Sequence, residues 1–308
     1  MVDQGYLHAM LLSSATLNLA GKRHEQYAGL SQMRFLDQCS DDLDSIIAEL
    51  LDQVRRERLR VFTRDRLVIN LTGDAQGLDA ARVALKELID ALPEGEQGST
   101  LASGELGRDW VGLALSSEVS FVARSATVPG MLDPVAPKLA VLAQIMSDGY
   151  FYEEIRVKGG AYGGFCTYRP MSGTFSLGSY RDPNLAKTID VFDGMIEAAK
   201  GAGVLTHATI QKAIIGCVGS FDGILDPCKK GQAALSRDLI GLTDEDRKRY
   251  RDALLAVDLD GVLNGALPVL EKAMKTAATA VVSSREKIEE ANSILPMEFE
   301  IQPFESPR

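Results

Sequence analysis

The sequence contains little cysteine, histidine or tryptophan. Among its 308 residues are four cysteines, three histidines and one tryptophan. The cysteines form no C-x-x-C pair, which excludes a dense disulfide framework and a cysteine-rich zinc site. The histidines, His8, His24 and His207, lie far apart and form neither H-E-x-x-H nor H-x-x-E-H. We therefore expect no complete zinc site in this chain.

The sequence also lacks an excess of basic residues and a long apolar run. With 43 acidic and 33 basic residues, its net charge is −10, which disfavours nucleic acid or an anionic membrane as the main partner. The longest early uncharged stretch, residues 9–21, is too short and too polar to span a bilayer. No basic segment typical of a signal peptide is present at its start. We expect a cytoplasmic protein, unless a targeting segment precedes this sequence.

The composition is that of a globular protein. Hydrophobic residues make up 45% and charged residues 25% of the chain. The length favours two domains. Residues 96–110 fall in a stretch rich in glycine, serine and glutamate, and we expect them to link a domain at 1–95 to a domain at 111–308.

The first domain is expected to be mostly helical. Apolar residues at helical spacing predict helices over 41–60 and 77–91. Between these helices, Leu67, Ile69 and Leu71 alternate with polar residues and predict a strand. One strand cannot form a sheet, so this segment either borrows strands or is part of something longer.

The second domain is expected to mix strands and helices. Strands are predicted at 119–128, 161–169, 173–180 and 277–282. Asp133-Pro134 and Asp182-Pro183 each predict the start of a helix, and further helices are predicted near 206–222, 243–255 and 258–274. Because strands bracket pairs of helices, the pattern indicates an α+β fold rather than strict alternation.

One segment, residues 153–164 (EEIRVKGGAYGG), is unusual for a scaffold. A helix ending in basic residues meets a double glycine, and an extended segment with a tyrosine follows. Arg156 offers a rigid fork of donors for a carbonyl or carboxylate group. The hydroxyl of Tyr162 is a neutral donor that can stabilise an oxyanion. The alternative is a helix C-cap that leads into a hairpin strand and has no catalytic role.

The segment RVKGGAYGG, followed by SGTFSLGSYRDPNLAKTIDVFDGM, resembles the C-terminal half of the pitrilysin-type zinc metallopeptidases, specifically the presequence protease and falcilysin branch. Residues 1–95 resemble the end of the third of the four homologous domains of that family, and 111–308 the fourth. The resemblance implies two-layer α+β domains, each an antiparallel-rich sheet packed with helices, one partial and one complete.

The resemblance also implies a function and its residues. In that family two halves close around an unfolded peptide, and the N-terminal half carries zinc on H-x-x-E-H. By motif position, Arg156 would hold a substrate carbonyl and Tyr162 would hydrogen-bond the scissile carbonyl. The implied substrate-binding residues are Gly159, Gly160, Ala161 and Gly163, with Tyr180 and Arg181 as further candidates facing the chamber or the other half.

We therefore expect the non-metal-binding half of a zinc metalloendopeptidase that is inactive alone. No cofactor is expected in this chain, and zinc is expected in the N-terminal half, on the same chain or on a separate subunit. Two alternatives remain. One is a structural or binding subunit that kept the fold without the chemistry. The other is the arginine- and tyrosine-bearing subunit of a heterodimeric protease.

Overall fold

The computed structural model describes residues 4–41, 43–95 and 110–304. The chain forms two compact units, one made of 1–34, 104–222 and 248–308 and the other of 35–103 and 223–247. The predicted linker at 96–110 lies, except for its last residue, outside the described residues. The division into domains at that linker therefore stays a prediction.

The first unit contains a six-stranded mixed sheet with the order β3-β4-β2-β5-β1-β6. The strands are β1 (Trp110–Ala114), β2 (Phe121–Thr127), β3 (Gly163–Arg169), β4 (Thr174–Tyr180), β5 (Ala278–Ser283) and β6 (Glu300–Pro303). Neighbouring strands from β3 to β5 run antiparallel, whereas β1 runs parallel to both β5 and β6. The antiparallel-rich sheet with packed helices confirms the predicted α+β class.

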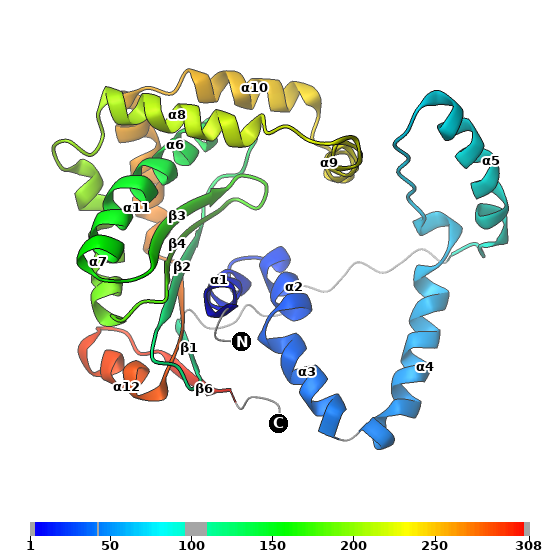
Figure 1. Ribbon diagram of the computed structural model, residues 1–308, viewed down its shortest axis with the longest axis horizontal. Coiled ribbons are helices and arrows are strands. Elements are labelled where there is room, and N and C mark those ends of the chain that lie inside the picture. The colour runs from blue at the N-terminus through cyan, green and yellow to red at the C-terminus, as the bar shows by residue number, and fades with distance from the viewer. Residues whose placement is uncertain (1–3, 42, 96–109, 305–308) are drawn as a thin grey trace. The chain divides into compact units, whose positions relative to one another are not determined.

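Helices cover both faces of this sheet (Figure 1). They include α1 (Gly5–Ala15), α2 (Leu19–Ala28), α6 (Ala136–Met146), η3 (Ser147–Lys158), α7 (Ala186–Lys200), α8 (His207–Phe221), η4 (Gly261–Ala266), α11 (Leu267–Met274) and α12 (Arg285–Ile294). Helix α1 packs on one face, against β2 and β5. Helices α6, α7 and α11 lie on the opposite face.

The core under α1 is made of alanine, aliphatic and aromatic side chains. Ala9 of α1 is fully buried and clusters with Phe121 and Ala123 of β2. A Cβ added at Gly5 would lie 2.4 Å from the Phe121 ring, so this glycine lets α1 approach the sheet closely. Ser13 of α1 and Ser125 of β2 share a buried hydrogen bond of 2.8 Å. These contacts fix α1 tightly to the sheet.

The second unit contains helices whose side chains are largely exposed. Helices α4 (Leu43–Val61), α5 (Ala75–Ala91) and α9 (Pro227–Leu239) and the short η2 (Arg64–Arg66) belong to it, while α3 (Leu30–Asp41) and α10 (Asp244–Leu255) run across the unit boundaries. Neither α4 nor α5 has a buried residue. In α4, the exposed apolar residues recur at helical spacing, as Leu43, Ile47, Leu51 and Val54. A stripe of this kind is typical of a helix that packs against another layer.

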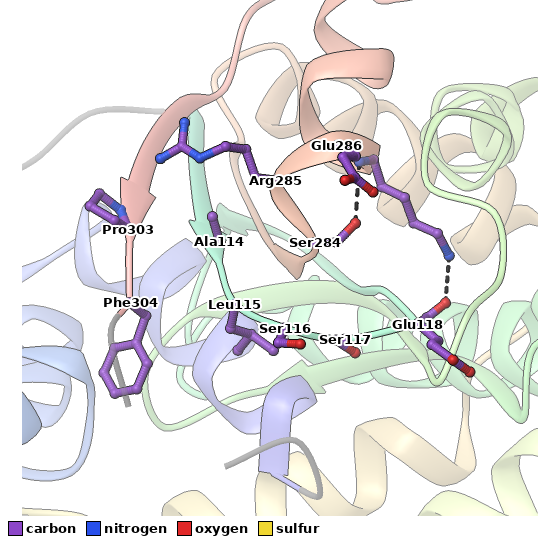
Figure 2. A pocket seen from close by; sticks show the side chains of 11 residues that line it. Ala114, Leu115, Ser116, Ser117, Glu118, Ser284, Arg285, Glu286, Pro303 and Phe304 are labelled. Atoms are coloured by element: carbon purple, nitrogen blue, oxygen red, sulfur yellow. Dashed lines mark hydrogen bonds between the residues drawn. The ribbon is translucent and has the colours of Figure 1, made fainter. Parts of the chain in front are cut away.

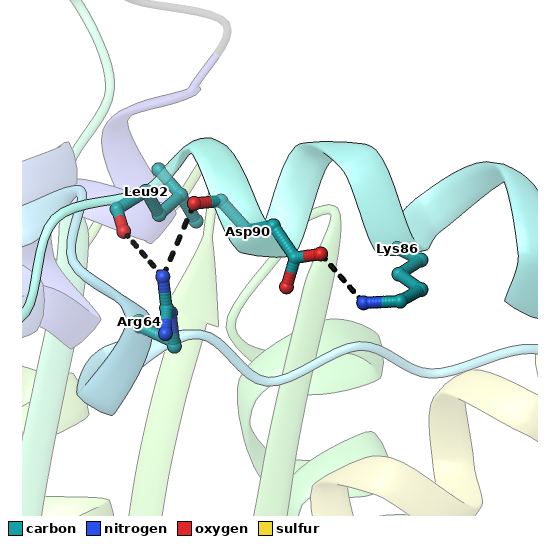
Figure 3. Close-up of polar contacts among 4 residues, drawn as sticks. All are labelled: Arg64, Lys86, Asp90 and Leu92. Carbon is teal, nitrogen blue, oxygen red and sulfur yellow. Dashed lines mark hydrogen bonds and ion pairs between the residues drawn. The ribbon is translucent and has the colours of Figure 1, made fainter.

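A polar contact holds the end of α5 (Figure 3). The guanidinium of Arg64 donates to the carbonyl oxygens of Asp90 and Leu92, at 3.1 and 3.2 Å. Cations at a helix C-terminus satisfy carbonyls that lack helical partners. The hydrogen bond from Lys86 lowers the pKa of the Asp90 carboxyl group. Arg64 thus lies, exposed, at the C-terminal end of α5.

The structure corrects several sequence predictions. Residues 67–71 form no strand, because no described segment pairs with them. The helix predicted at Asp182-Pro183 starts at Ala186. Asp182 lies in the loop before it, and its carboxylate accepts hydrogen bonds from the Asn184 N–H and from the hydroxyl of Thr188, which is in the helix. The helix predicted at Asp133 starts later too, at Ala136.

Several elements were not predicted from the sequence, among them β1, β6 and α9. Of the helices that the structure describes, none has both the length and the apolar composition needed to cross a bilayer.

Candidate functional site

The candidate site begins where η3 ends at the double glycine. Gly160 has a φ of 76°, a left-handed conformation that glycine adopts without strain. Its N–H donates to the Arg156 carbonyl, and the N–H of Ala161 donates to the Ile155 carbonyl, both at 3.1 Å. These nested bonds close the helix in the way that a left-handed C-terminal residue allows. A Cβ at Gly159 would lie 2.5 Å from the Ile155 oxygen, so both glycines serve this turn.

The chain then enters β3, the edge strand of the sheet. The N–H of Tyr162 donates to the Tyr180 carbonyl at 3.1 Å, and the β3–β4 ladder begins at the next residue, where Gly163 pairs with Tyr180. A side chain at Gly163 would meet open space, whereas a Cβ at Gly164 would lie 2.7 Å from that of Ile155. Close packing of β3 on η3 therefore sets the direction in which Tyr162 leaves the turn.

The structure brings Arg156 and Tyr162 together. The guanidinium carbon of Arg156 lies 5.8 Å from the centroid of the Tyr162 ring and 5.5 Å from that of Tyr152. Such distances are those of a cation–π contact. The side chain of Tyr162 is 68% exposed, and Arg156 is exposed as well. Two strong hydrogen-bond donors thus stand side by side on a turn, open to a ligand.

The buried carboxyl group of Asp182 supports the turn through Asn184. Asp182 is fully buried, and its oxygens accept hydrogen bonds from the Thr188 hydroxyl at 2.6 Å and the Asn184 N–H at 2.9 Å. The side chain of Asn184 in turn donates to the Gly159 carbonyl at 2.6 Å. Burial raises the pKa of the Asp182 carboxyl group, while these hydrogen bonds oppose the rise. No pattern in the sequence predicts this link between Asn184 and Gly159.

The other predicted site residues are placed differently. Ala161 is buried, so only its backbone is available to a ligand. Tyr180 is half-buried, and its ring contacts the rings of Tyr6, Phe121 and Tyr162. Arg181 is exposed, has a positive φ of 49°, and places its guanidinium carbon 5.6 Å from the Tyr180 ring.

No metal-binding cluster occurs among the described residues. No group of three or more histidine, cysteine, aspartate and glutamate side chains there is placed so that it could hold a metal ion. Cys166, on the same strand as the site, is buried, and burial raises the pKa of its thiol well above the ordinary value. A protonated, buried thiol is inert, so this cysteine is a packing residue.

A cavity of about 800 Å³ lies elsewhere, where β1, β5 and β6 end and α12 begins (Figure 2). The Lys287 ammonium group donates to the Glu118 carbonyl at 2.6 Å, and the Lys287 N–H donates to the Ser284 hydroxyl at 3.3 Å. Lys287 therefore links the start of α12 to the segment that follows β1. Neither Arg156 nor Tyr162 lines it.

Comparison with known proteins identifies relatives of this chain. The family model described as the PreP C-terminal domain matches residues 112–285. Presequence protease 1, chloroplastic/mitochondrial, of Arabidopsis thaliana is 33% identical over 94% of this chain. Protein HypA of Clostridium perfringens is 27% identical over 94% of it. The chain spans 27% and 29% of the lengths of these two curated relatives.

A solved structure shares the fold. The peptidase M16 inactive domain from Pseudomonas fluorescens superposes with a TM-score of 0.56 at 16% identity, covering 76% of this chain and 57% of that one. Since the family model covers more than half of the sequence, the chain belongs to the PreP C-terminal domain family of pitrilysin-type peptidases.

Proposed function

We propose that this chain is the C-terminal, non-metal-binding half of a zinc metalloendopeptidase that degrades unfolded peptides in a closed chamber. The observation that carries the proposal is the pair formed by Arg156 and Tyr162 on the double-glycine turn. A scaffold has no need of an exposed phenol and an exposed guanidinium on a turn that is braced by a buried carboxyl group. The name of the Arabidopsis relative, a presequence protease, agrees with this function.

Each residue has a role that follows from its donors. The guanidinium of Arg156 would donate to a backbone carbonyl of the peptide and hold the chain in register. The hydroxyl of Tyr162 would donate to the scissile carbonyl oxygen and stabilise the negative charge that develops as the carbonyl becomes tetrahedral. Gly159, Gly160, Ala161 and Gly163 would let the peptide backbone approach, because three of them lack side chains and the fourth is buried.

Zinc is expected from the other half rather than from this chain. The described residues do not fit a zinc site, because they offer no cluster of ligands. Activation of the attacking water therefore belongs to a zinc-bearing N-terminal half, and the isolated chain would be inactive. We propose a cytoplasmic location, which a targeting segment upstream of this sequence would change.

The test is the substitution Tyr162→Phe in the enzyme assembled with its zinc-bearing half. Removal of one oxyanion donor lowers kcat by about a hundredfold, equal to about 3 kcal/mol, with little change in KM. Tyr27→Phe is the matched control, because Tyr27 is also 68% exposed but lies on α2. If Tyr162→Phe leaves turnover unchanged, the structural-subunit alternative replaces this proposal.

The size of the native polypeptide separates the two forms of the proposal. An immunoblot of source cells with antibodies against this chain would show a band far above 33.3 kDa if both halves share one polypeptide. A band at 33.3 kDa would instead identify the arginine- and tyrosine-bearing subunit of a heterodimeric protease.

A further inference from the structure

We propose that Tyr180 is a positioning residue for Tyr162, and that Tyr6 of α1 and Phe121 of β2 hold it in place. The inference rests on the proposed function, because it concerns how the hydroxyl of Tyr162 is aimed at a substrate carbonyl. It gives α1 a role in the site, although Tyr6 on this helix precedes Tyr162 by some 150 residues.

The rings form a continuous row from α1 to η3. The Tyr6 and Tyr180 centroids are 5.3 Å apart with an interplanar angle of 86°, and the Tyr180 and Tyr162 centroids are 5.6 Å apart at 73°. Both are edge-to-face pairs, the arrangement that aromatic rings prefer. Phe121 supports Tyr180 from β2 at 5.6 Å, and Arg156 continues the row beyond Tyr162.

Tyr162 needs such support because its own surroundings are open. It lies one residue before the β3–β4 ladder starts and is mostly exposed, so its backbone is anchored while its side chain extends into solvent. An unsupported tyrosine would sample several rotamers, and each rotamer places the hydroxyl several ångströms from the others. A donor works in catalysis only when it is held in position before the charge develops.

Tyr180 can supply this support because it is itself fixed. Its backbone pairs with β3, and its ring is half-buried between α1 and β2. Helix α1 is held in turn by the close approach of Gly5 to Phe121 and by the Ser13–Ser125 hydrogen bond. The row of rings thus transmits the rigidity of the sheet core to an exposed side chain.

The competing role for Tyr180 is direct substrate binding through its hydroxyl group. The two roles predict different variants to be harmful. Substrate binding depends on the hydroxyl, so Tyr180→Phe would raise KM. Positioning depends on the ring, so Tyr180→Leu would lower kcat and Tyr180→Phe would restore most of the loss.

The first experiment measures kcat and KM of the assembled enzyme. Tyr180→Leu and Tyr6→Leu each lower kcat by about tenfold with KM unchanged, as expected when a catalytic donor is misplaced by a fraction of an ångström to an ångström. Phe221→Leu is the matched control, because it removes a ring paired with Tyr250 at 5.3 Å on another part of the same unit. An equal loss in Phe221→Leu, or a rise in KM alone, would overturn the proposal.

A double substitution shows whether Tyr180 acts through Tyr162. In the Tyr162→Phe background, Tyr180→Leu should cause no further loss of kcat, because the hydroxyl that it positions is already absent. If the two losses multiply, Tyr180 acts independently and the proposal is wrong.

A second measurement does not depend on activity. In the chain alone, the NMR signals of the Tyr162 ring protons should be displaced from those of free tyrosine, because the Tyr180 ring lies close enough to shift them by its ring current. Tyr180→Leu and Tyr6→Leu should move these NMR signals towards the positions of free tyrosine. Unchanged signals overturn the positioning role. Shifted signals together with full turnover in Tyr162→Phe would instead mean that the row of rings exists and that the proposed catalytic function fails.

Discussion

At the scale of single residues, the two adjacent glycines at the start of β3, Gly163 and Gly164, differ in the space available for a side chain. A Cβ at Gly164 would lie 2.7 Å from the Cβ of Ile155 and 2.9 Å from the Phe151 carbonyl oxygen, whereas one at Gly163 would have no neighbour within 4 Å. We predict that Gly164→Ala lowers the free energy of unfolding by about 1–3 kcal/mol, because β3 must move away from η3. Gly163→Ala should change it by less than about 0.5 kcal/mol.

Urea titration of both variants measures these differences. The pair is closely matched, since the two positions are neighbours in one strand and receive the same added methyl group. Equal destabilisation by the two substitutions would contradict the close packing of β3 on η3.

A buried histidine on α1, His8, should make the stability of the chain depend on pH. Burial lowers the pKa of His8 from its ordinary value of 6.5, and the nearby Glu25 carboxylate opposes this shift. The unfolded chain then binds the proton more tightly than the folded one. The stability that neutral His8 provides is therefore complete above pH 6.5 and is lost as the pH falls through the lower, folded-state pKa.

We predict that the free energy of unfolding falls more steeply in the native chain than in His8→Asn when the pH is lowered from about 7.5 to about 5.5. Urea titrations at several pH values measure the two slopes, and carboxyl groups common to both proteins cancel in the comparison. Identical slopes would show that His8 titrates as freely in the folded chain as in the unfolded one.

At the scale of elements, sequence patterns predicted the parts with clear periodicity and turn residues, including β2 and β5, which pair with each other across a long sequence distance. The β3–β4 hairpin and helices α4, α5, α8 and α10 formed close to where periodicity and turn residues placed them. Among the elements that were missed, strands β1 and β6 are short, and they join the sheet through parallel pairing with segments far away in sequence. Local patterns contain no signal for such pairing.

The candidate site shows the same limit. Arg156, the double glycine and Tyr162 form one continuous motif, and the sequence predicted them as a group. Tyr6 lies on a helix that reaches the site only because α1 folds onto the sheet. The side chain of Asn184 donates to the Gly159 carbonyl, a contact that no sequence motif indicates. Neither role could be predicted, because each depends on contacts between segments that are distant along the chain.

In residues 67–71, apolar and polar residues alternate as in a strand, but no described strand pairs with them. Leu67, Ile69 and Leu71 are each 37% exposed, so the apolar face predicted for a strand is present but only partly covered. We predict that the amide hydrogens of 67–71 exchange with solvent nearly as fast as those of an unfolded chain, because the structure pairs them with no strand. The amides of β5, which has a strand on each side, should be protected.

Hydrogen exchange followed by mass spectrometry compares the two segments in one experiment. Protection of 67–71 similar to that of β5 would mean that these residues pair with a strand in solution. Such a result would favour the interpretation that this segment borrows strands.

At the scale of the whole molecule, the two compact units differ in how their apolar side chains are covered. In the first unit, helices on both faces bury the sheet, and Leu142 of α6 is fully buried. In the second unit, α4 and α5 contribute no buried residue, and Leu51 of α4 is 47% exposed. Cooperative unfolding requires an apolar core, so the first unit should account for most of the stability.

We predict that calorimetry of the chain shows one cooperative transition at higher temperature, from the first unit, and a weak, broad transition below it. Leu142→Ala should lower the temperature of the main transition, since removing a fully buried leucine costs about 2–5 kcal/mol. Leu51→Ala should leave the main transition in place, because an exposed leucine contributes within about 0.5 kcal/mol. If both substitutions lower one shared transition equally, the units unfold together. The exposed apolar faces of α4 and α5 would then be covered in solution, and their covering would contribute to the stability of the whole chain.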